Sequence, residues 1–142
     1  RSLGVLVVGD MVASVGTILV EPRDGDMIDY LAGLRRLEGM EAKVALPAHG
    51  DPIPEPSKLF RAYVAHRLLR EAKIKRALEA AVEGSLDDLV RVAYADTPEP
   101  LWPIAKMSLE AHLVKLERDG AAHRTGGERF AIGRATGGIV AP

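Results

Sequence analysis

The chain opens on an apolar segment that reads Leu3-Gly4-Val5-Leu6-Val7-Val8-Gly9-Asp10. Valine and leucine in so dense a run are typical of a β-strand that is covered on both faces. A glycine and an aspartate then end the run, as they do at many strand ends. Since such a strand needs neighbours and almost nothing precedes it, we expect the chain to begin within a domain.

The residues that follow predict strands alternating with a helix. Residues 17–21 form a short alternating strand, and residues 26–37 form a helix with Asp26 as its cap and apolar residues at helical spacing. Residues 43–46 form another short strand, which ends at Pro47-Ala48-His49-Gly50. This alternation predicts an α/β layer in the first part of the chain.

Positive charge is concentrated in one segment of the chain. Residues 58–76 carry a net charge of +6, whereas residues 1–57 and 77–119 carry −4 and −5. Apolar residues recur at near-helical intervals through the basic segment, so we predict one long helix over residues 57–82. A turn is expected to follow it at residues 83–85.

The last third of the chain predicts two helices and a β-hairpin. Ser85 is placed to cap a helix over residues 86–94, and a second helix covers residues 104–119. Two short strands then flank a glycine-rich turn at residues 125–128. Because this order is that of the later part of a winged-helix module, we predict a winged-helix-like domain with a loose tail.

The second of these helices is electrically neutral. Its basic residues are matched in number by acidic ones: Lys106, Lys115 and Arg118 against Glu110, Glu117 and Asp119. A helix that reads a nucleic-acid groove normally presents a basic, polar face to phosphates and bases. We therefore expect this helix to serve in packing rather than in DNA recognition.

Composition excludes several classes of protein. The 142 residues are 47% hydrophobic and 27% charged, a content too apolar for a disordered chain, and their net charge is −1. No apolar run approaches the roughly 18 residues that would span a membrane. The sequence has no cysteine, which excludes disulfides, thiolate metal sites and cysteine nucleophiles and is compatible with the cytoplasm.

Two residues are candidates for metal binding, because each follows a predicted strand of the α/β layer. Asp10 and His49 stand where functional side chains are often found, although a turn-capping aspartate and an ordinary loop histidine are the structural alternatives. Together they offer a carboxylate and an imidazole, which divalent metals accept as ligands. Two ligands do not hold zinc, since a catalytic site needs at least three from the protein.

His66, Arg67 and Arg70 are candidates for binding an anionic substrate, because they lie close together on the long basic helix. An arginine fork binds a phosphate or a carboxylate in bidentate fashion. The structural alternative pairs these residues with Glu71 or with the acidic residues of 83–119, which would hold the two parts of the chain together. We expect His66 and Arg67 to lie near the site. We expect Lys73, Lys75 and Arg76 to lie in solvent or at the contact between the α/β layer and the winged-helix-like domain.

Several strings of residues together resemble the second half of a metallo-β-lactamase-fold hydrolase. They are Val8-Gly9-Asp10-Met11-Val12, Gly25-Asp26-Met27-Ile28-Asp29-Tyr30-Leu31 and Leu46-Pro47-Ala48-His49-Gly50-Asp51-Pro52-Ile53. The continuation Tyr63-Val64-Ala65-His66-Arg67-Leu68-Leu69-Arg70-Glu71, with the winged-helix-like end, is similar to the subgroup around β-lactamase-like protein 2. The resemblance extends to about residue 132.

This resemblance implies both an α/β and an α+β part. Residues 1–55 would be the C-terminal half of an αββα sandwich, residues 56–82 a basic linking helix, and residues 83–142 the winged-helix-like domain with its loose tail. It also implies a site with two zinc ions, in which Asp10 matches the aspartate that bridges both metals and His49 matches the final histidine, a ligand of the second metal. A hydroxide held there would cleave an ester, thioester, lactam or RNA phosphodiester bond.

The same resemblance implies that this chain is a fragment and is inactive alone. The His-x-His-x-Asp-His signature of the family and one further histidine lie upstream of its bridging aspartate, and only nine residues precede Asp10 here. The partner would be the missing N-terminal half, and the substrate a small acyl compound or single-stranded RNA that His66, Arg67 and Arg70 bind. Two alternatives stay open: a winged-helix nucleic-acid-binding module, and a structural or partner-binding remnant, with a homo-oligomer as one possible assembly.

Overall fold

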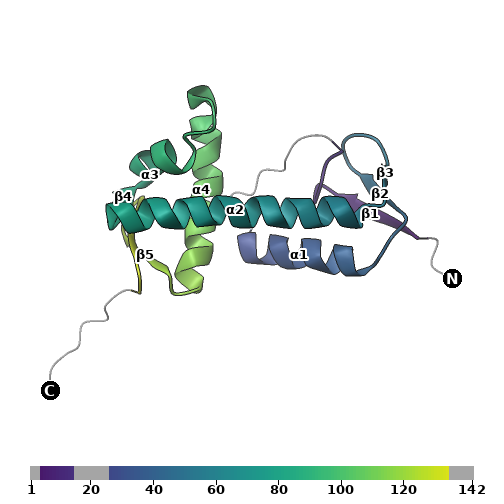
Figure 1. Ribbon diagram of the computed structural model, residues 1–142, viewed down its shortest axis with the longest axis horizontal. Helices are drawn as coiled ribbons and strands as arrows, with labels where there is room; N and C mark the ends of the chain where they lie inside the picture. The colour runs from purple at the N-terminus through teal and green to yellow at the C-terminus, as the bar shows by residue number, and fades with distance from the viewer. Residues whose placement is uncertain (1–3, 15–25, 135–142) are drawn as a thin grey trace, which may run out of the picture.

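The computed structural model describes residues 4–14 and 26–134. Two bundles of helices and small sheets stand at the two ends of one long helix (Figure 1). The strand predicted over residues 17–21 and the tail after residue 134 lie outside the described residues. No helix in the described ranges combines the length and the apolar character that crossing a membrane requires.

The first sheet has three short strands in the order β1-β2-β3. They are β1 (Val5–Gly9), β2 (Val44–Pro47) and β3 (Ile53–Pro54). β1 and β2 are parallel, with Val5 opposite Val44, whereas β2 and β3 are antiparallel. Because parallel strands need a crossover, the chain passes from β1 to β2 through helix α1 (Met27–Gly39).

Strand β1 is buried on one face only among the described residues, whereas the sequence predicts a strand covered on both faces. Val8 is buried, but Val5 is 47% exposed and Val7 is 81% exposed. Side chains alternate along a strand, so residues 5 and 7 share the uncovered face. Helices α1 and α2 pack on the other face and leave this one without a covering layer among the described residues.

Helix α1 begins where the sequence predicts. The Asp26 carboxylate accepts hydrogen bonds from the backbone N–H groups of Ile28 and Asp29, at 2.8 and 3.0 Å. These bonds satisfy two of the donors that a helix start leaves open. The buried face of α1 consists of Met27, Tyr30, Leu31 and Leu34.

Helix α2 (Ser57–Ala81) belongs to both hydrophobic cores, and its length agrees with the predicted helix over residues 57–82. Phe60 and Val64 near its start pack against the first sheet and α1. Ile74 and Leu78 near its end pack against the C-terminal elements. One continuous helix thus connects the two ends of the molecule (Figure 1).

The C-terminal elements form the predicted helix–helix–hairpin, with one strand more. They are β4 (Glu83–Ser85), α3 (Leu86–Ala93), the 3-10 turn η1 (Glu99–Leu101), α4 (Trp102–Arg118), β5 (Ala122–Gly126) and β6 (Arg129–Ile132). The expected turn at residues 83–85 is wrong, because these residues pair with β6 and complete a sheet in the order β4-β6-β5. Ser85 and Asp88 form the capping box of α3.

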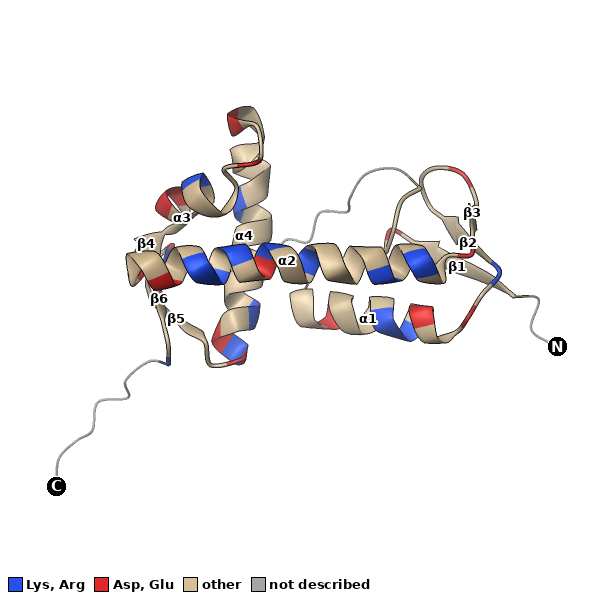
Figure 2. Ribbon diagram, viewed as in Figure 1, with Lys and Arg blue, Asp and Glu red and all other residues tan. Residues whose placement is uncertain are grey.

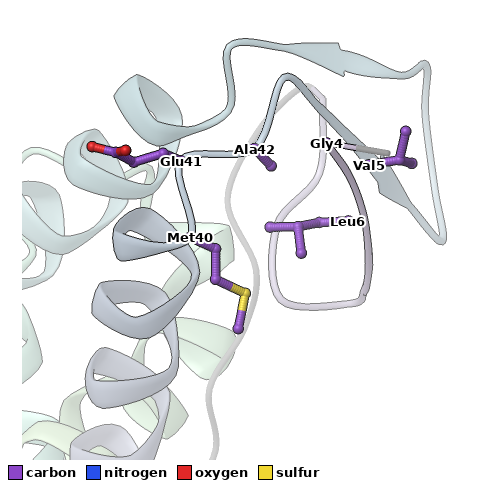
Figure 3. Close-up of a pocket in the computed structure, with 6 residues that line it drawn as sticks. All are labelled: Gly4, Val5, Leu6, Met40, Glu41 and Ala42. Carbon is purple, nitrogen blue, oxygen red and sulfur yellow. The ribbon is translucent and has the colours of Figure 1, made fainter. Parts of the chain in front are cut away.

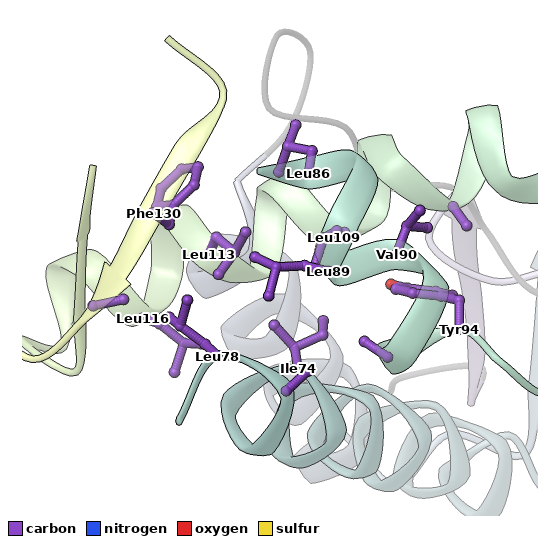
Figure 4. Packing of buried hydrophobic residues seen from close by; sticks show 14 residues of the cluster. Ile74, Leu78, Leu86, Leu89, Val90, Tyr94, Leu109, Leu113, Leu116 and Phe130 are labelled. Atoms are coloured by element: carbon purple, nitrogen blue, oxygen red, sulfur yellow. The ribbon is translucent and has the colours of Figure 1, made fainter. Parts of the chain in front are cut away.

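Helix α4 lies in the interior of this second core. Leu109 and Leu113 are fully buried, together with Leu89 of α3 and Phe130 of β6 (Figure 4). These buried residues show that α4 packs in the core, as expected, and its role toward nucleic acid stays a prediction.

Candidate functional site

The two predicted metal ligands stand side by side at one end of the first sheet. Asp10 follows the C-terminal end of β1, and His49 follows that of the neighbouring parallel strand β2. His49 Nε2 lies 3.5 Å from Asp10 Oδ1, and the side chains are 83% and 75% exposed. The sequence placed both residues at strand ends, and the structure brings their polar atoms together.

Two hydrogen bonds between the loops hold these side chains close together. The N–H of Ala48 donates to the carbonyl of Gly9 at 2.8 Å, and the N–H of Asp51 donates to Ser14 Oγ at 3.1 Å. The loop after β1 is therefore tied to the loop after β2 on both sides of the pair formed by Asp10 and His49. Ser14 was not singled out in the sequence, because its role depends on a contact 37 residues away.

Gly50 allows the two loops to approach so closely. Its φ is +97°, and a Cβ at this position would lie 1.9 Å from Ser14 Oγ and 3.0 Å from Ser14 Cβ. Both the backbone conformation and the space therefore require glycine directly after His49.

We expect Gly50→Ala to destabilise the protein by about 1–3 kcal/mol, because strain at φ and the contact with Ser14 add together. Urea unfolding measures the change. Gly39→Ala is the matched control, since a Cβ on this α1 residue meets nothing within 4 Å. A helical Gly→Ala change of this kind stabilises by up to about 1 kcal/mol. Equal stability of Gly50→Ala and the wild type would contradict the tight loop contact.

The donor set at this end of the sheet fits part of a metal site. A carboxylate and an imidazole that are largely open to solvent are suitable ligands for zinc. Among residues 4–14 and 26–134, however, no three His, Cys, Asp or Glu side chains are grouped so that they could hold an ion. Asp10 and His49 can therefore contribute to a metal centre but do not complete one within the described residues.

Basic residues occur along the length of α2, as Figure 2 shows. One of them, Arg70, contacts the end of α3 and the turn after it. Its guanidinium forms two hydrogen bonds with the Asp96 carboxylate, at 2.8 and 3.2 Å, and a third with the carbonyl of Ala93 at 2.7 Å. It also lies 4.3 Å from the centroid of the Tyr94 ring. Hydrogen bonds from Arg70 and Lys73 hold the pKa of Asp96 far below its usual value of 3.8. Arg70 therefore joins two helices, and these contacts support the structural alternative rather than substrate binding.

Arg67 is buried where α1, α2 and α4 meet. Only 5% of it is exposed, its Nη1 donates to Ser108 Oγ at 3.3 Å, and its guanidinium lies 5.6 Å from the centroid of the Tyr30 ring. A side chain enclosed in this way is poorly placed to bind a substrate from solvent. For Arg67, too, the geometry supports the structural alternative.

His66 and the remaining basic residues of α2 are exposed, as expected for Lys73, Lys75 and Arg76. Lys73 pairs with Asp96 at 3.0 Å, so it lies at the contact between the two parts. Partial desolvation lowers the pKa of His66, and the charges of Arg67 and Arg70 lower it further. The predicted role of His66 in substrate binding stays a prediction.

A separate pocket of about 270 Å³ lies at the opposite end of the first sheet (Figure 3). Residues 4–6 at the start of β1 and residues 40–42 after α1 form its walls. Asp10 and His49 follow the other ends of β1 and β2, so this pocket is not part of the candidate site.

Comparison with known proteins agrees with this architecture. Residues 85–130 match the family model of the beta-lactamase associated winged helix domain. Solved structures with a similar fold include a metallo-beta-lactamase family protein from Thermus thermophilus, with a TM-score of 0.68, and a beta-lactamase domain protein from Burkholderia ambifaria, with a TM-score of 0.73. Each match has 26% sequence identity and covers 91% of the present chain. It covers 42% of the Thermus thermophilus chain and 41% of the Burkholderia ambifaria chain.

Two relatives share the name Beta-lactamase-like protein 2 homolog. The Drosophila melanogaster protein is 34% identical over 119 residues, or 82% of this chain, and the Caenorhabditis elegans protein is 29% identical over 122 residues, or 86%. The chain spans only about two fifths of the length of either relative, 39% and 40%. The chain thus belongs with the metallo-β-lactamase-fold proteins similar to β-lactamase-like protein 2, and it corresponds to their C-terminal part with the associated winged-helix domain.

Proposed function

We propose that this chain supplies part of the active site of a metal-dependent hydrolase, with Asp10 and His49 as ligands of a two-zinc centre. The observation that carries the proposal is the position of the two side chains, 3.5 Å apart at adjacent ends of parallel strands. A shared carboxylate offsets the charge of two dications, and a neutral imidazole donates to a metal without adding charge. The two-zinc composition itself rests on the resemblance to the family.

The other ligands would come from the N-terminal half that the longer relatives contain. Two features support this proposal: the relatives are more than twice as long as the matched region, and β1 leaves Val5 and Val7 uncovered. In the complete protein, a second layer would cover that apolar face and bring the missing ligands to Asp10 and His49. With two ligands alone, the chain would be inactive.

The reaction would be hydrolysis of an ester, thioester, lactam or RNA phosphodiester bond. Bound metal ions supply two effects, a lower pKa of water and polarisation of the scissile bond. The contribution of this chain is to hold a carboxylate and an imidazole in a fixed relation, through the two loop contacts of Gly9 and Ser14. Fold alone does not decide among these substrates.

The winged-helix domain, by contrast, offers little for nucleic-acid binding. Basic residues of α4 and of the hairpin are already paired with acids: Lys106 with Asp87, Lys115 with Glu71 and Asp119, Arg118 with Asp26, Arg124 with Glu110, and Arg129 with Glu83. Exposed apolar residues lie directly before α4 and in its first turns, namely Leu101 of η1 and Ile104 and Met107 of α4. These features support packing and argue against groove recognition, which depends on available cations.

Asp10→Asn and His49→Gln, each made in the complete protein that carries this sequence, test the proposal. We expect each variant to lose bound zinc and hydrolytic activity on thioester and single-stranded RNA substrates while its thermal stability with chelator present stays near that of the wild type. Asp51→Asn is the control, because this exposed acid lies in the same loop as His49. Unchanged zinc content in both variants would show that these residues are not ligands.

A further inference from the structure

Two tyrosine hydroxyls form hydrogen bonds with the backbone of the loop that carries Asp10. Residues 10–14 leave the sheet through a turn in which the N–H of Met11 donates to the carbonyl of Val8 at 3.1 Å. Residues 12–14, the last described residues of this segment, belong to neither a helix nor a strand. The conformation of residues 12–14 therefore depends on contacts with helices α1 and α2.

Tyr30 of α1 provides the first contact. Its hydroxyl donates to the carbonyl of Met11 at 2.9 Å, one residue after Asp10, and the side chain is buried. Burial raises the pKa of Tyr30, so the phenol keeps its proton and remains a donor at neutral pH.

Tyr63 of α2 provides the second contact. Its hydroxyl donates to the carbonyl of Ala13 at 3.2 Å and accepts from the N–H of the same residue at 3.4 Å. One phenol thus contacts both backbone groups of a single loop residue. The two tyrosines come from different helices and contact the loop at residues 11 and 13, one and three residues after Asp10.

We propose that Tyr30 and Tyr63 are positioning residues, whose hydroxyl groups fix the loop after β1 so that the Asp10 carboxylate stays beside His49. This inference rests on the proposed role of Asp10 as a metal ligand. Removing a group that orients a metal ligand, without binding the metal itself, commonly lowers metal affinity about 10–100-fold.

The alternative is that Tyr30 and Tyr63 contribute only to hydrophobic packing. Both rings belong to the core between α1, α2 and the first sheet. A phenylalanine preserves that packing and removes only the hydroxyl. Tyr→Phe variants therefore separate positioning from packing, and they leave the core intact.

Tyr94→Phe is the matched control. Tyr94 and Tyr63 are each 5% exposed, but Tyr94 lies in the second core with the C-terminal elements. The same chemical change is thus made at the same burial, away from the Asp10 loop.

The experiment compares Tyr30→Phe, Tyr63→Phe, the double variant and Tyr94→Phe in the complete protein. Zinc affinity is measured by competition with a chromophoric chelator, and amide hydrogen exchange over residues 11–14 is measured on the metal-free protein. We expect the double variant to bind zinc about tenfold more weakly. We also expect faster exchange at Ala13 in Tyr63→Phe, whereas Tyr94→Phe changes neither quantity.

Zinc affinity and loop exchange that match those of Tyr94→Phe would overturn the proposal. Asp10→Asn separates the metal-ligand role of Asp10 from the positioning role of the two tyrosines. If Asp10→Asn lowers zinc binding but the tyrosine variants do not, the positioning role is wrong and the metal role stands. If Asp10→Asn leaves zinc binding unchanged, the metal role is wrong and the positioning role fails with it, even where Tyr63→Phe still loosens the loop.

Discussion

Replacing Glu71 with alanine is expected to lower the free energy of unfolding by about 2–4 kcal/mol, because the change breaks a largely buried polar network. The Glu71 carboxylate accepts from Lys115 Nζ at 2.9 Å and lies 3.4 Å from His112 Nδ1. A carboxylate only accepts, so His112 must donate through Nδ1. Without Glu71, a fully buried imidazole would lose its partner.

The network also predicts how stability changes with pH. Burial alone would raise the pKa of Glu71, but hydrogen bonds from His112 and Lys115 outweigh it and lower the pKa below its usual 4.5. A lowered folded-state pKa means that the contribution of Glu71 is fully present above pH 4.5 and is lost as the pH falls through the folded value. The stability difference between wild type and Glu71→Gln should therefore be largest at neutral pH and shrink below pH 4.5.

Urea unfolding at several pH values checks both expectations. Glu79→Ala is the matched control, because this acid is exposed on the same helix and its loss should change stability by less than about 0.5 kcal/mol. A Glu71→Ala variant as stable as Glu79→Ala would show that the network contributes little. A stability difference from Glu71→Gln that stays constant down to low pH would contradict the lowered pKa.

Much of the fold could be predicted from the sequence, because local signals determine it. Helices α1 to α4 show apolar residues at helical spacing, and Asp26 and Ser85 mark the starts of α1 and α3 by capping chemistry. The hairpin follows from its glycine turn. The proximity of Asp10 and His49 was also predictable, because adjacent parallel strands end at the same edge of a sheet.

Other features depend on contacts between distant residues and left no local signal. Strand β4 is three residues long and contains Gly84, so its sequence reads as a turn until β6 pairs with it. Tyr30 and Tyr63 occupy apolar positions of their helices, and nothing in that pattern shows that their hydroxyls reach a loop. A basic helix is likewise compatible with a substrate site or with a contact between helices until the acids opposite it are known.

For Arg67, a role in substrate binding and a role in helix packing predict opposite effects of an alanine substitution. Arg67→Ala removes a nearly buried side chain between Tyr30 of α1 and Ser108 of α4, together with its hydrogen bond. We expect a loss of about 2–4 kcal/mol and a melting temperature lower by several degrees. In the protein that remains folded, kcat/KM for an anionic substrate should change little, because the guanidinium does not face solvent.

Calorimetry and steady-state kinetics on the same preparation of the complete protein make this test, with Arg61→Ala as the control. Arg61 lies on the same helix, its side chain is 69% exposed, and it pairs with Glu38 at 2.8 Å. An exposed pair of this kind contributes at most about 1 kcal/mol. If Arg67→Ala instead keeps its melting temperature and loses kcat/KM for an anionic substrate, Arg67 reaches the substrate in the complete protein, and the enclosure by α1 and α4 must open there. A lower melting temperature with unaltered kinetics would show that Arg67 stabilises the packing of α1 and α4 on α2 and does not bind the substrate.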